Sequence, residues 1–469
     1  MNTALRSGEG ASLASLFTAD NEEFTLASHS RVGVVGGGPA GSFFAYFVQQ
    51  MAEQAGLELE VDIYEPRHFT HSGPAGCNHC GGIVSESLVQ LLATEGIVLP
   101  TDLVQRGIDT YVLHMDVGQV AIKAAALEKR IAAVFRGNGP RNPQPVEIIG
   151  FDRFMLDQCR NKGANLVRKL VRGIVWEDGR PHIETVDGGR ERYDLVVVAV
   201  GVNSQALQLF RKAAPDYRPP KTMKAFICEF RLGRALVQDC LGQSMHVFLL
   251  DLPHLEFAAL IPKGEIVTLC LLGDDIDDEL VATFLGSKEV RAVFPGAVVP
   301  PPVCHCFPRI NVHAATRPFA DRIVWVGDSG VCKLFKDGIG SAYRTSKAAA
   351  TTAVFRGIAA TDFEQRFWRE CSSLKTDNSI AVFIFAVTKL IQKVRFLRYG
   401  VLRMVAQEQG RSPGRRHMSN MLWDVFTGSA PYKEILLRSM KPEFPVQMVW
   451  NVVAGNCARI GRREDGGHP

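Results

Sequence analysis

Residues 31–43 read RVGVVGGGPAGSF, and this stretch decides the fold of the chain. It begins with a short apolar run of the kind that forms a buried parallel strand. Three glycines with the spacing G-x-G-x-x-G follow, namely Gly36, Gly38 and Gly41. They allow a tight turn, a close approach of phosphate to the backbone, and close packing of the next helix, respectively. Pro39 and Ala40 begin that helix, and its N-terminal amides favour a phosphate.

A second strand and an acidic residue follow where a dinucleotide site requires them. Residues 42–56 have the length of a helix, residues 59–64 read as a strand, and Glu65 ends that strand. A carboxylate about 20 residues beyond the glycines can accept hydrogen bonds from ribose hydroxyls. The order of these elements therefore predicts a dinucleotide-binding unit. A glycine-rich turn in some other α/β unit is the alternative.

Composition limits the class of protein. The chain has 469 residues, 46% of them hydrophobic, which suffices for two or three interleaved units. A net charge of +4 without a basic block argues against nucleic-acid binding, and eleven scattered cysteines indicate a reducing compartment. No apolar run is long enough for a membrane span or a secretory signal. We expect a cytoplasmic protein, either free or peripherally attached to a membrane.

A second glycine motif stands late in the chain. Gly327-Asp328 ends a strand, and Gly338-Ile339-Gly340 opens a long alanine-rich helix. Such a carboxylate can accept a hydrogen bond from a sugar or ribityl hydroxyl, and the helix N-terminus can stabilise the negative charge of a reduced flavin. Arg153 and Asp157 share a helix face, so Arg153 either reaches the cofactor or forms a surface ion pair.

Two close cysteine pairs admit several interpretations. Cys77 and Cys80 form C-x-x-C before two glycines, and Cys304 and Cys306 form C-x-C. The first pair fits a redox dithiol, half of a metal site, or small residues in a loop near the cofactor. Four thiolates could hold zinc or an iron–sulfur cluster. The two pairs are too far apart in the sequence for their spacing to indicate a shared metal site, and we predict no metal.

At this stage the chain resembles the FAD-dependent oxidoreductases of the para-hydroxybenzoate hydroxylase superfamily. The resemblance rests on the first glycine motif with Glu65, on DLVVVAVGVNS from residue 194 onward, and on the second glycine motif, which keeps the superfamily's spacing. It implies bound FAD, with Glu65 at the adenosine ribose, Arg153 along the FAD, and Asp328 at the ribityl chain.

The resemblance implies an α/β fold in which a three-layer Rossmann-like FAD-binding domain is interleaved with a mixed-sheet α+β substrate domain, followed by C-terminal helices. We expect residues 1–28 to form a flexible lead-in. We assign the FAD-binding domain to residues 29–105, 146–218 and 304–357. We assign the substrate domain to residues 106–145 and 219–303, and a helical region to residues 358–469.

Within the superfamily, Cys80-Gly81-Gly82 most resembles the geranylgeranyl reductase family, which implies a reductase passing hydride from N5 of reduced FAD to an apolar, isoprenoid substrate. The family's Y-x-W-x-F-P motif survives only as FAALIP, residues 257–262, without the tryptophan. Cys80, Lys336 and Asp337 are the candidate catalytic residues. The last two place charge beside the expected flavin ring, where Lys333 adds a third charged group.

Two other functions stay open: an FAD-dependent monooxygenase acting on an aromatic or lipid substrate, and a non-catalytic flavin or thiol redox sensor or electron-transfer protein. The electron donor is NAD(P)H or a reduced redox protein, with ferredoxin-like proteins and quinones as candidate partners. Residues 380–403 combine an apolar helix face with a basic rim, which fits a membrane surface or an ordinary docked helix.

Overall fold

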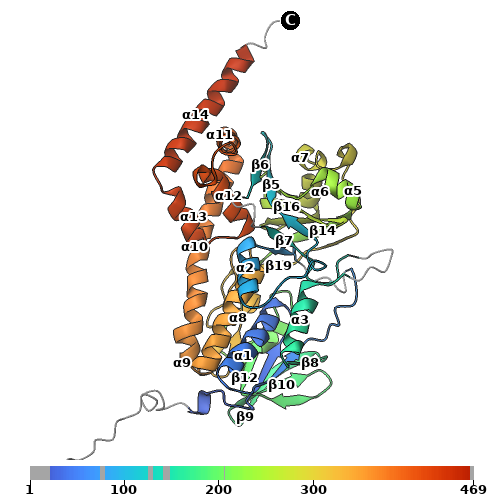
Figure 1. Cartoon of the computed structure of the whole chain (residues 1–469), viewed down its shortest axis with the longest axis vertical. Helices are drawn as coiled ribbons and strands as arrows, with labels where there is room; N and C mark the ends of the chain where they lie inside the picture. The colour runs from blue at the N-terminus through green and yellow to red at the C-terminus, as the bar shows by residue number, and fades with distance from the viewer. Residues whose placement is uncertain (1–21, 74–79, 125–129, 141–147, 205, 465–469) are drawn as a thin grey trace, which may run out of the picture.

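The computed structural model describes residues 22–73, 80–124, 130–140, 148–204 and 206–464. Cys77 lies outside these residues, so the predicted cysteine pair is described only at Cys80. A helix-covered sheet holds the N-terminal part of the chain, a second sheet lies beyond it, and the C-terminal helices run along both (Figure 1).

The glycine motif follows a central strand of a six-stranded sheet with the order β20-β21-β12-β1-β2-β8. All its strands are parallel except the edge strand β20, which pairs antiparallel with β21. Their bounds are β1 (Arg31–Val35), β2 (Glu60–Tyr64), β8 (Asn165–Val167), β12 (Leu195–Val198), β20 (Phe319–Ala320) and β21 (Ile323–Trp325). The carboxyl ends of β1, β2, β12 and β21 therefore meet at one edge, where ligands bind in such sheets.

Each face of this sheet has its own cover because successive side chains of a strand point to opposite faces. Val197 joins a core with three helices, α1 (Pro39–Gln54), α3 (Phe151–Asn161) and α8 (Gly338–Phe355). Val196 and Val198 instead join a core with an antiparallel sheet of three strands. These strands are β9 (Val171–Glu177), β10 (Arg180–Thr185) and β11 (Arg190–Arg192). The result is the predicted three-layer Rossmann-like unit.

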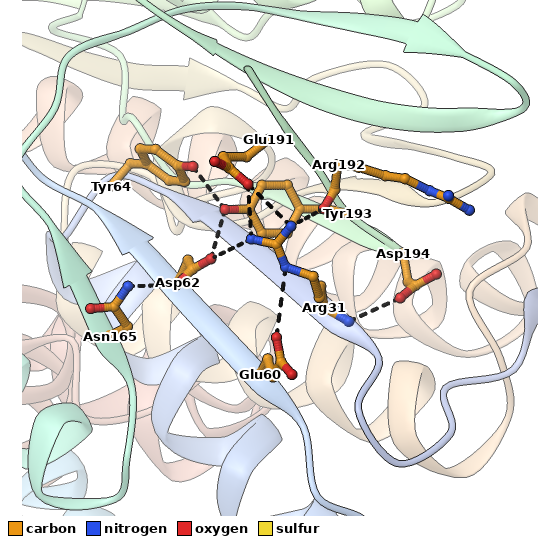
Figure 2. Close-up of polar contacts among 9 residues, drawn as sticks. All are labelled: Arg31, Glu60, Asp62, Tyr64, Asn165, Glu191, Arg192, Tyr193 and Asp194. Carbon is orange, nitrogen blue, oxygen red and sulfur yellow. Dashed lines mark hydrogen bonds and ion pairs between the residues drawn. The ribbon is translucent and has the colours of Figure 1, made fainter. Parts of the chain in front are cut away.

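A polar network fastens the small antiparallel sheet to the large one (Figure 2). The hydroxyl of Tyr193 donates to Asp62 Oδ2 at 2.8 Å and lies 2.7 Å from the hydroxyl of Tyr64. The Arg31 guanidinium stacks on the Tyr193 ring and pairs with Asp62 and Glu191. Burial raises the pKa of Tyr193, so its hydroxyl stays protonated and keeps donating. The network thus holds Tyr64, at the end of β2, in place.

A seven-stranded mixed sheet forms the second unit, in the order β18-β14-β17-β16-β15-β5-β6, with β15 and β5 parallel. Its strands are β5 (Thr110–Met115), β6 (Gly118–Lys123), β14 (Phe226–Arg231), β15 (Ser244–Phe248), β16 (Leu255–Lys263), β17 (Ile266–Gly273) and β18 (Cys304–Cys306). Cys304 and Cys306 therefore lie on an edge strand of this sheet, just past the expected boundary at residue 303. Three helices, α5 (Arg234–Cys240), α6 (Asp278–Gly286) and α7 (Lys288–Arg291), pack on one face.

Shorter elements join the two units. One small sheet consists of β3 (Ile83–Val84), β7 (Ile131–Ala133) and β4 (Arg106–Ile108), and another of β13 (Lys221–Lys224) and β19 (Arg309–His313). Helices α2 (Glu86–Thr94) and α4 (Ala206–Phe210) lie beside them in the chain.

The C-terminal helices after residue 380 cover the other face of the seven-stranded sheet, whereas those before it lie beside α1 and α8 (Figure 1). They are α9 (Ala360–Asp362), α10 (Trp368–Lys393), α11 (Arg395–Glu408), α12 (His417–Thr427), α13 (Tyr432–Ser439) and α14 (Glu443–Glu464). Together with the two sheets they complete the predicted fold class. Within the described residues, no helix is both long and apolar enough to cross a bilayer.

Candidate cofactor-binding and active site

The glycine turn after β1 is shaped so that only glycine fits at two of its positions. Gly36 has a φ of +107°, in the region that favours glycine. A Cβ on Gly41 would lie 1.9 Å from the Gly36 carbonyl oxygen. Gly38 precedes α1 and offers no capping side chain, and Pro39 follows it in the first turn. The helix N-terminus therefore keeps free amides for an anion.

Glu65 lies where β2 ends and is only 4% exposed. Its Oε2 accepts a hydrogen bond from the Gly37 amide at 3.1 Å, and its Oε1 accepts from the Arg67 guanidinium at 3.0 Å. The carboxylate thus borders the glycine turn, where a ribose hydroxyl can reach it.

An arginine that the sequence did not indicate lies beside the turn. Arg136 follows β7, and one of its Nη atoms would be 3.3 Å from a Cβ on Gly38. Its guanidinium binds Asp152 in two places, at 3.0 and 2.7 Å, and Asp152 is fully buried. Burial works to lower the pKa of Arg136, but this carboxylate more than offsets it and raises the pKa. The side chain therefore offers a fixed positive charge at the place where a pyrophosphate would meet the helix.

Arg153, the predicted cofactor arginine, is not part of this cluster. It lies one position after Asp152 on α3, pairs with Asp157 at 3.9 Å, and does not line the cavity described below. Its placement agrees with the surface ion pair that the sequence left open.

Asp328 carries a buried oxygen without a partner in the described part of the chain. Gly327 has a φ of +60°, and a Cβ there would lie 2.5 Å from Ala40 Cβ, so this loop touches the first turn of α1. The adjoining Asp328 lines the cavity, and its Oδ1 accepts no hydrogen bond from any described residue. Burial raises the pKa of Asp328, against the opposing effects of the Cys332 thiol and Arg136. A hydroxyl donor from a ligand would satisfy the orphaned oxygen.

Lys336 and Asp337 occupy the loop before α8. The Lys336 ammonium donates to the Phe426 carbonyl at 2.9 Å and lies 3.9 Å from the centre of the Phe257 ring. Burial lowers the pKa of Lys336 to about 7. Asp337 caps α8 by accepting from the Gly340 amide, and burial raises its pKa to about 6. At neutral pH Lys336 therefore holds its proton only about half of the time, so it can give or take one.

The C-terminal helices hold this loop from outside. The Asn378 side chain of α10 accepts from the Leu334 amide and donates to the Cys332 carbonyl, each at 2.8 Å. The Tyr432 hydroxyl of α13 donates to the Leu334 carbonyl at 2.8 Å. Nothing in the hydrophobic periodicity of residues 358–469 signalled these contacts.

Glu65, Arg136, Asp328, Lys336 and Asp337 all line a single cavity of about 540 Å³. One end is formed by the glycine turn, Glu65, Arg136 and Asp328, and the other by an apolar wall. The wall is made by the seven-stranded sheet and α12 and includes Ile227, Met245, Phe257, Ala259, Ile261, Leu272 and Phe426. Cys80 lies between the ends, and its sulfur accepts from the Gly82 amide at 3.3 Å.

Most of the predicted site residues meet in this cavity. Those that line it are Gly36, Gly38, Pro39, Ala40, Glu65, Cys80, Asp328, Lys336, Asp337, Gly338 and Ile339. Gly41, Gly327 and Gly340 shape the turns just behind them. Among the described residues, no group of three or more His, Cys, Asp or Glu side chains is placed to hold a metal ion.

Comparison with known proteins identifies the fold but no family. No family model and no curated protein matches the chain in sequence. Among solved structures, the peptidyl tryptophan dihydroxylase QhpG, essential for tryptophylquinone cofactor biogenesis, matches with a TM-score of 0.53 at 17% identity. The match covers 78% of this chain and 76% of QhpG.

Two further matches cover nearly the whole of the other chain. The flavin-dependent brominase Bmp2 matches with a TM-score of 0.57 at 15% identity, over 85% of this chain and 99% of its own. A variant of HpxO from Klebsiella pneumoniae, solved with FAD, matches with a TM-score of 0.54 at 15% identity, over 86% and 100%. The chain thus has the fold of these proteins, of which Bmp2 is flavin-dependent and HpxO was solved with FAD. The resemblance to geranylgeranyl reductases gains no support from them.

Proposed function

We propose that this chain is an FAD-dependent oxidoreductase that hydroxylates an apolar, aromatic substrate. The observation that carries the proposal is the alignment of four groups on one cavity: the glycine turn, Glu65, Arg136 and the orphaned oxygen of Asp328. The glycine turn and Arg136 match the needs of a pyrophosphate, Glu65 those of an adenosine ribose, and Asp328 those of a ribityl chain.

In this proposal Arg136 and the first turn of α1 hold the pyrophosphate, Glu65 accepts from the adenosine ribose, and Asp328 accepts from a ribityl hydroxyl. The N-terminus of α8, at Gly338 and Ile339, stabilises negative charge on the flavin ring. FAD, when bound, supplies two-electron redox chemistry and the activation of oxygen.

The chain's own residues would then position the substrate and handle its proton. The apolar wall around Phe257 and Phe426 binds an apolar ring and keeps water away from it. Lys336 Nζ, held against both rings, accepts a proton from an acidic substrate hydroxyl, which its lowered pKa allows at neutral pH.

A hydroxylase is favoured over the isoprenoid reductase expected from the sequence for two reasons. Similar structures carry the names of a dihydroxylase and a brominase. The substrate end of the cavity also offers an aromatic wall with an amine rather than the reductase family's tryptophan-bearing motif. We propose NAD(P)H or a reduced redox protein as donor, and the cytoplasm as location.

Anaerobic reconstitution with FAD tests the proposal. We expect flavin absorbance bands that survive gel filtration, bleach with NADPH, and return on admission of air. Oxygen uptake should then rise with phenolic substrates. Turnover of a prenyl alcohol without oxygen would identify a reductase instead, and protein that retains no FAD would refute the proposal altogether.

A further inference from the structure

The outer face of α10 is apolar and exposed. Ala381 and Phe385 point into the core and are 0% and 4% exposed. Phe383, Val387 and Leu390, which we call the outer stripe, are 57%, 42% and 54% exposed. They follow one another at the spacing i, i+4, i+7, so they lie along one side of the helix. A run of large apolar side chains on one exposed face, unlike a single one, marks an interaction surface.

The same stretch of chain is basic and contains no acid. Residues 378–407 include five Lys or Arg and no Asp or Glu. Two of the five form ion pairs at the seven-stranded sheet: Lys389 pairs with Glu256 of β16, and Arg398 pairs with Asp116 in the turn between β5 and β6. Lys393 and Arg395, at the junction of α10 and α11, are exposed, and no ion pair to a described acid is formed by either.

Positive charge therefore lies at the end of the outer stripe, next to Phe396, which is 51% exposed. An apolar helix face with Lys and Arg beside it fits the interface of an anionic bilayer, because the apolar groups enter the acyl boundary while the cations meet the headgroups. We propose that the outer stripe, with Lys393 and Arg395, binds an anionic membrane surface.

Charge argues against the other occupants. In a symmetric dimer formed through this face, the same patch would meet itself, and because residues 378–407 contain no acid, Lys393 and Arg395 would find no acid in that stretch of the other copy. An apolar partner without acids would leave both cations desolvated and unpaired. An anionic bilayer pairs the cations and accepts the apolar side chains at once.

The position of α10 gives this surface a use, a point that depends on the proposed function. Phe385, on the inner face of α10, stacks on Phe257 at 6.1 Å and meets Phe335 edge-on at 4.9 Å. Both rings line the cavity. A single helix thus separates the cavity from the surface, and membrane attachment would bring the enzyme to apolar substrates that dissolve in lipid.

Vesicle co-sedimentation of the full chain tests the surface. The probes are phosphatidylcholine vesicles with and without phosphatidylglycerol. The variants are Phe383→Ser with Leu390→Ser, and Lys393→Glu with Arg395→Glu. The matched controls make the same kinds of change elsewhere. Val186→Ser replaces an apolar residue that is 59% exposed on the FAD-binding unit, and Lys288→Glu replaces a lysine of α7 whose side chain is 83% exposed.

We expect binding to the anionic vesicles only, weakened about tenfold or more by the paired serine variant and about fivefold for each cation lost. The controls should bind as the unchanged protein does. Circular dichroism and FAD retention of each variant report folding, and the substituted side chains are exposed, so their replacement leaves the core packing intact.

Three results would overturn the proposal. They are absence of binding to both vesicles, equal binding by the serine and control variants, and a solution dimer that the serine variant dissociates while vesicles remain unbound. Vesicle binding does not require FAD, so protein that binds vesicles but retains no FAD would refute the proposed function and leave the membrane surface intact.

Discussion

Replacing Asp328 by Asn should stabilise the FAD-free protein and weaken FAD binding. In the FAD-free chain the buried Oδ1 of Asp328 accepts no hydrogen bond from the described residues, and burial raises the pKa of the group. An unsatisfied buried polar atom costs about 1–3 kcal/mol. The neutral amide removes the buried charge but keeps an unpaired oxygen, so we expect it to raise the free energy of unfolding by only about 1 kcal/mol, the lower end of that range.

The sign of the pH dependence follows from the raised pKa. An acid with a folded-state pKa above its ordinary 3.8 binds more protons in the folded state, so its charged form destabilises the fold above the folded pKa. The penalty shrinks as the pH falls through the folded-state pKa and is gone below 3.8, where the carboxyl is protonated in both states. The advantage of Asp328→Asn should therefore be present at neutral pH and shrink on acidification.

The effect on FAD has the opposite sign. A hydrogen bond to a charged acceptor contributes about 1.5–3 kcal/mol, and one to a neutral acceptor about 0.5–1.5 kcal/mol. Asp328→Asn should thus weaken FAD binding about five- to tenfold. Urea unfolding of the FAD-free protein and fluorescence titration with FAD measure the two effects, with exposed Asp102→Asn as the control. A variant that is less stable without FAD, or that binds FAD with unchanged affinity, would refute this assignment of Asp328.

Other consequences can be measured separately. Gly41→Ala should abolish FAD binding and lower the free energy of unfolding by about 1–3 kcal/mol, since its Cβ would meet the Gly36 oxygen at 1.9 Å. In urea titrations Gly173→Ala, with nothing within 4 Å, should change little. Burial lowers the pKa of Lys336 to about 7, so Lys336 should react with an amine reagent at neutral pH far faster than an ordinary lysine. Peptide mass spectrometry should show that the extent of labelling is half-maximal near pH 7 and that FAD protects Lys336 from the reagent. His114 and His246 contact each other at 3.0 Å, and burial lowers their pKa values to about 3 and 4. Below pH 6.5 the unfolded state therefore binds more protons, and on acidification the free energy of unfolding should fall by up to about 1.4 kcal/mol per histidine and pH unit. In urea unfolding across this pH range, the free energy of unfolding of His246→Met should fall less steeply with decreasing pH.

Several predicted cofactor-binding residues lie together in the structure, and each of them has a position fixed by a nearby turn or by the end of a strand. Gly36 and Gly41 are fixed by a turn between a strand and its own helix, and Glu65 follows the strand that pairs next to β1. A rule about strand ends in parallel sheets then brings Asp328, nearly three hundred residues later, to the same edge. No long-range contact had to be guessed for any of them.

Arg136 was missed because its signal is not periodic. It lies in a stretch rich in Gly, Pro and Asn that reads as a loop. Its partner Asp152 begins α3, beside the Arg153 that was chosen instead. In the structure the chain after β7 meets the start of α3, where the Asp152 amide donates to the Arg136 carbonyl at 3.1 Å. This contact shows that Arg136, and not Arg153, faces the glycine turn. The clue to Arg136 is that Asp152, in the first turn of α3, is buried and needs a positively charged partner. The sequence alone does not show that Asp152 is buried, so this clue could not be used.

Lys333 and Lys336 show why charge near an expected flavin is not enough to assign a role. Both place charge beside the expected flavin ring, but only Lys336 was a candidate catalytic residue, and both lie in the loop that α10, α12 and α13 enclose. The Lys333 ammonium donates to two carbonyls, those of Gly428 and Ala430, at 3.0 and 2.6 Å, so it fastens the end of α12. Lys336 has a single carbonyl, that of Phe426, and two aromatic rings, so less holds its proton in place. Burial lowers the pKa of both lysines, but Lys333 is held by one more carbonyl. These carbonyls come from the end of α12 and the turn after it, about ninety residues along the chain, so the C-terminal region, the least informative part of the sequence, determines how firmly each lysine is held.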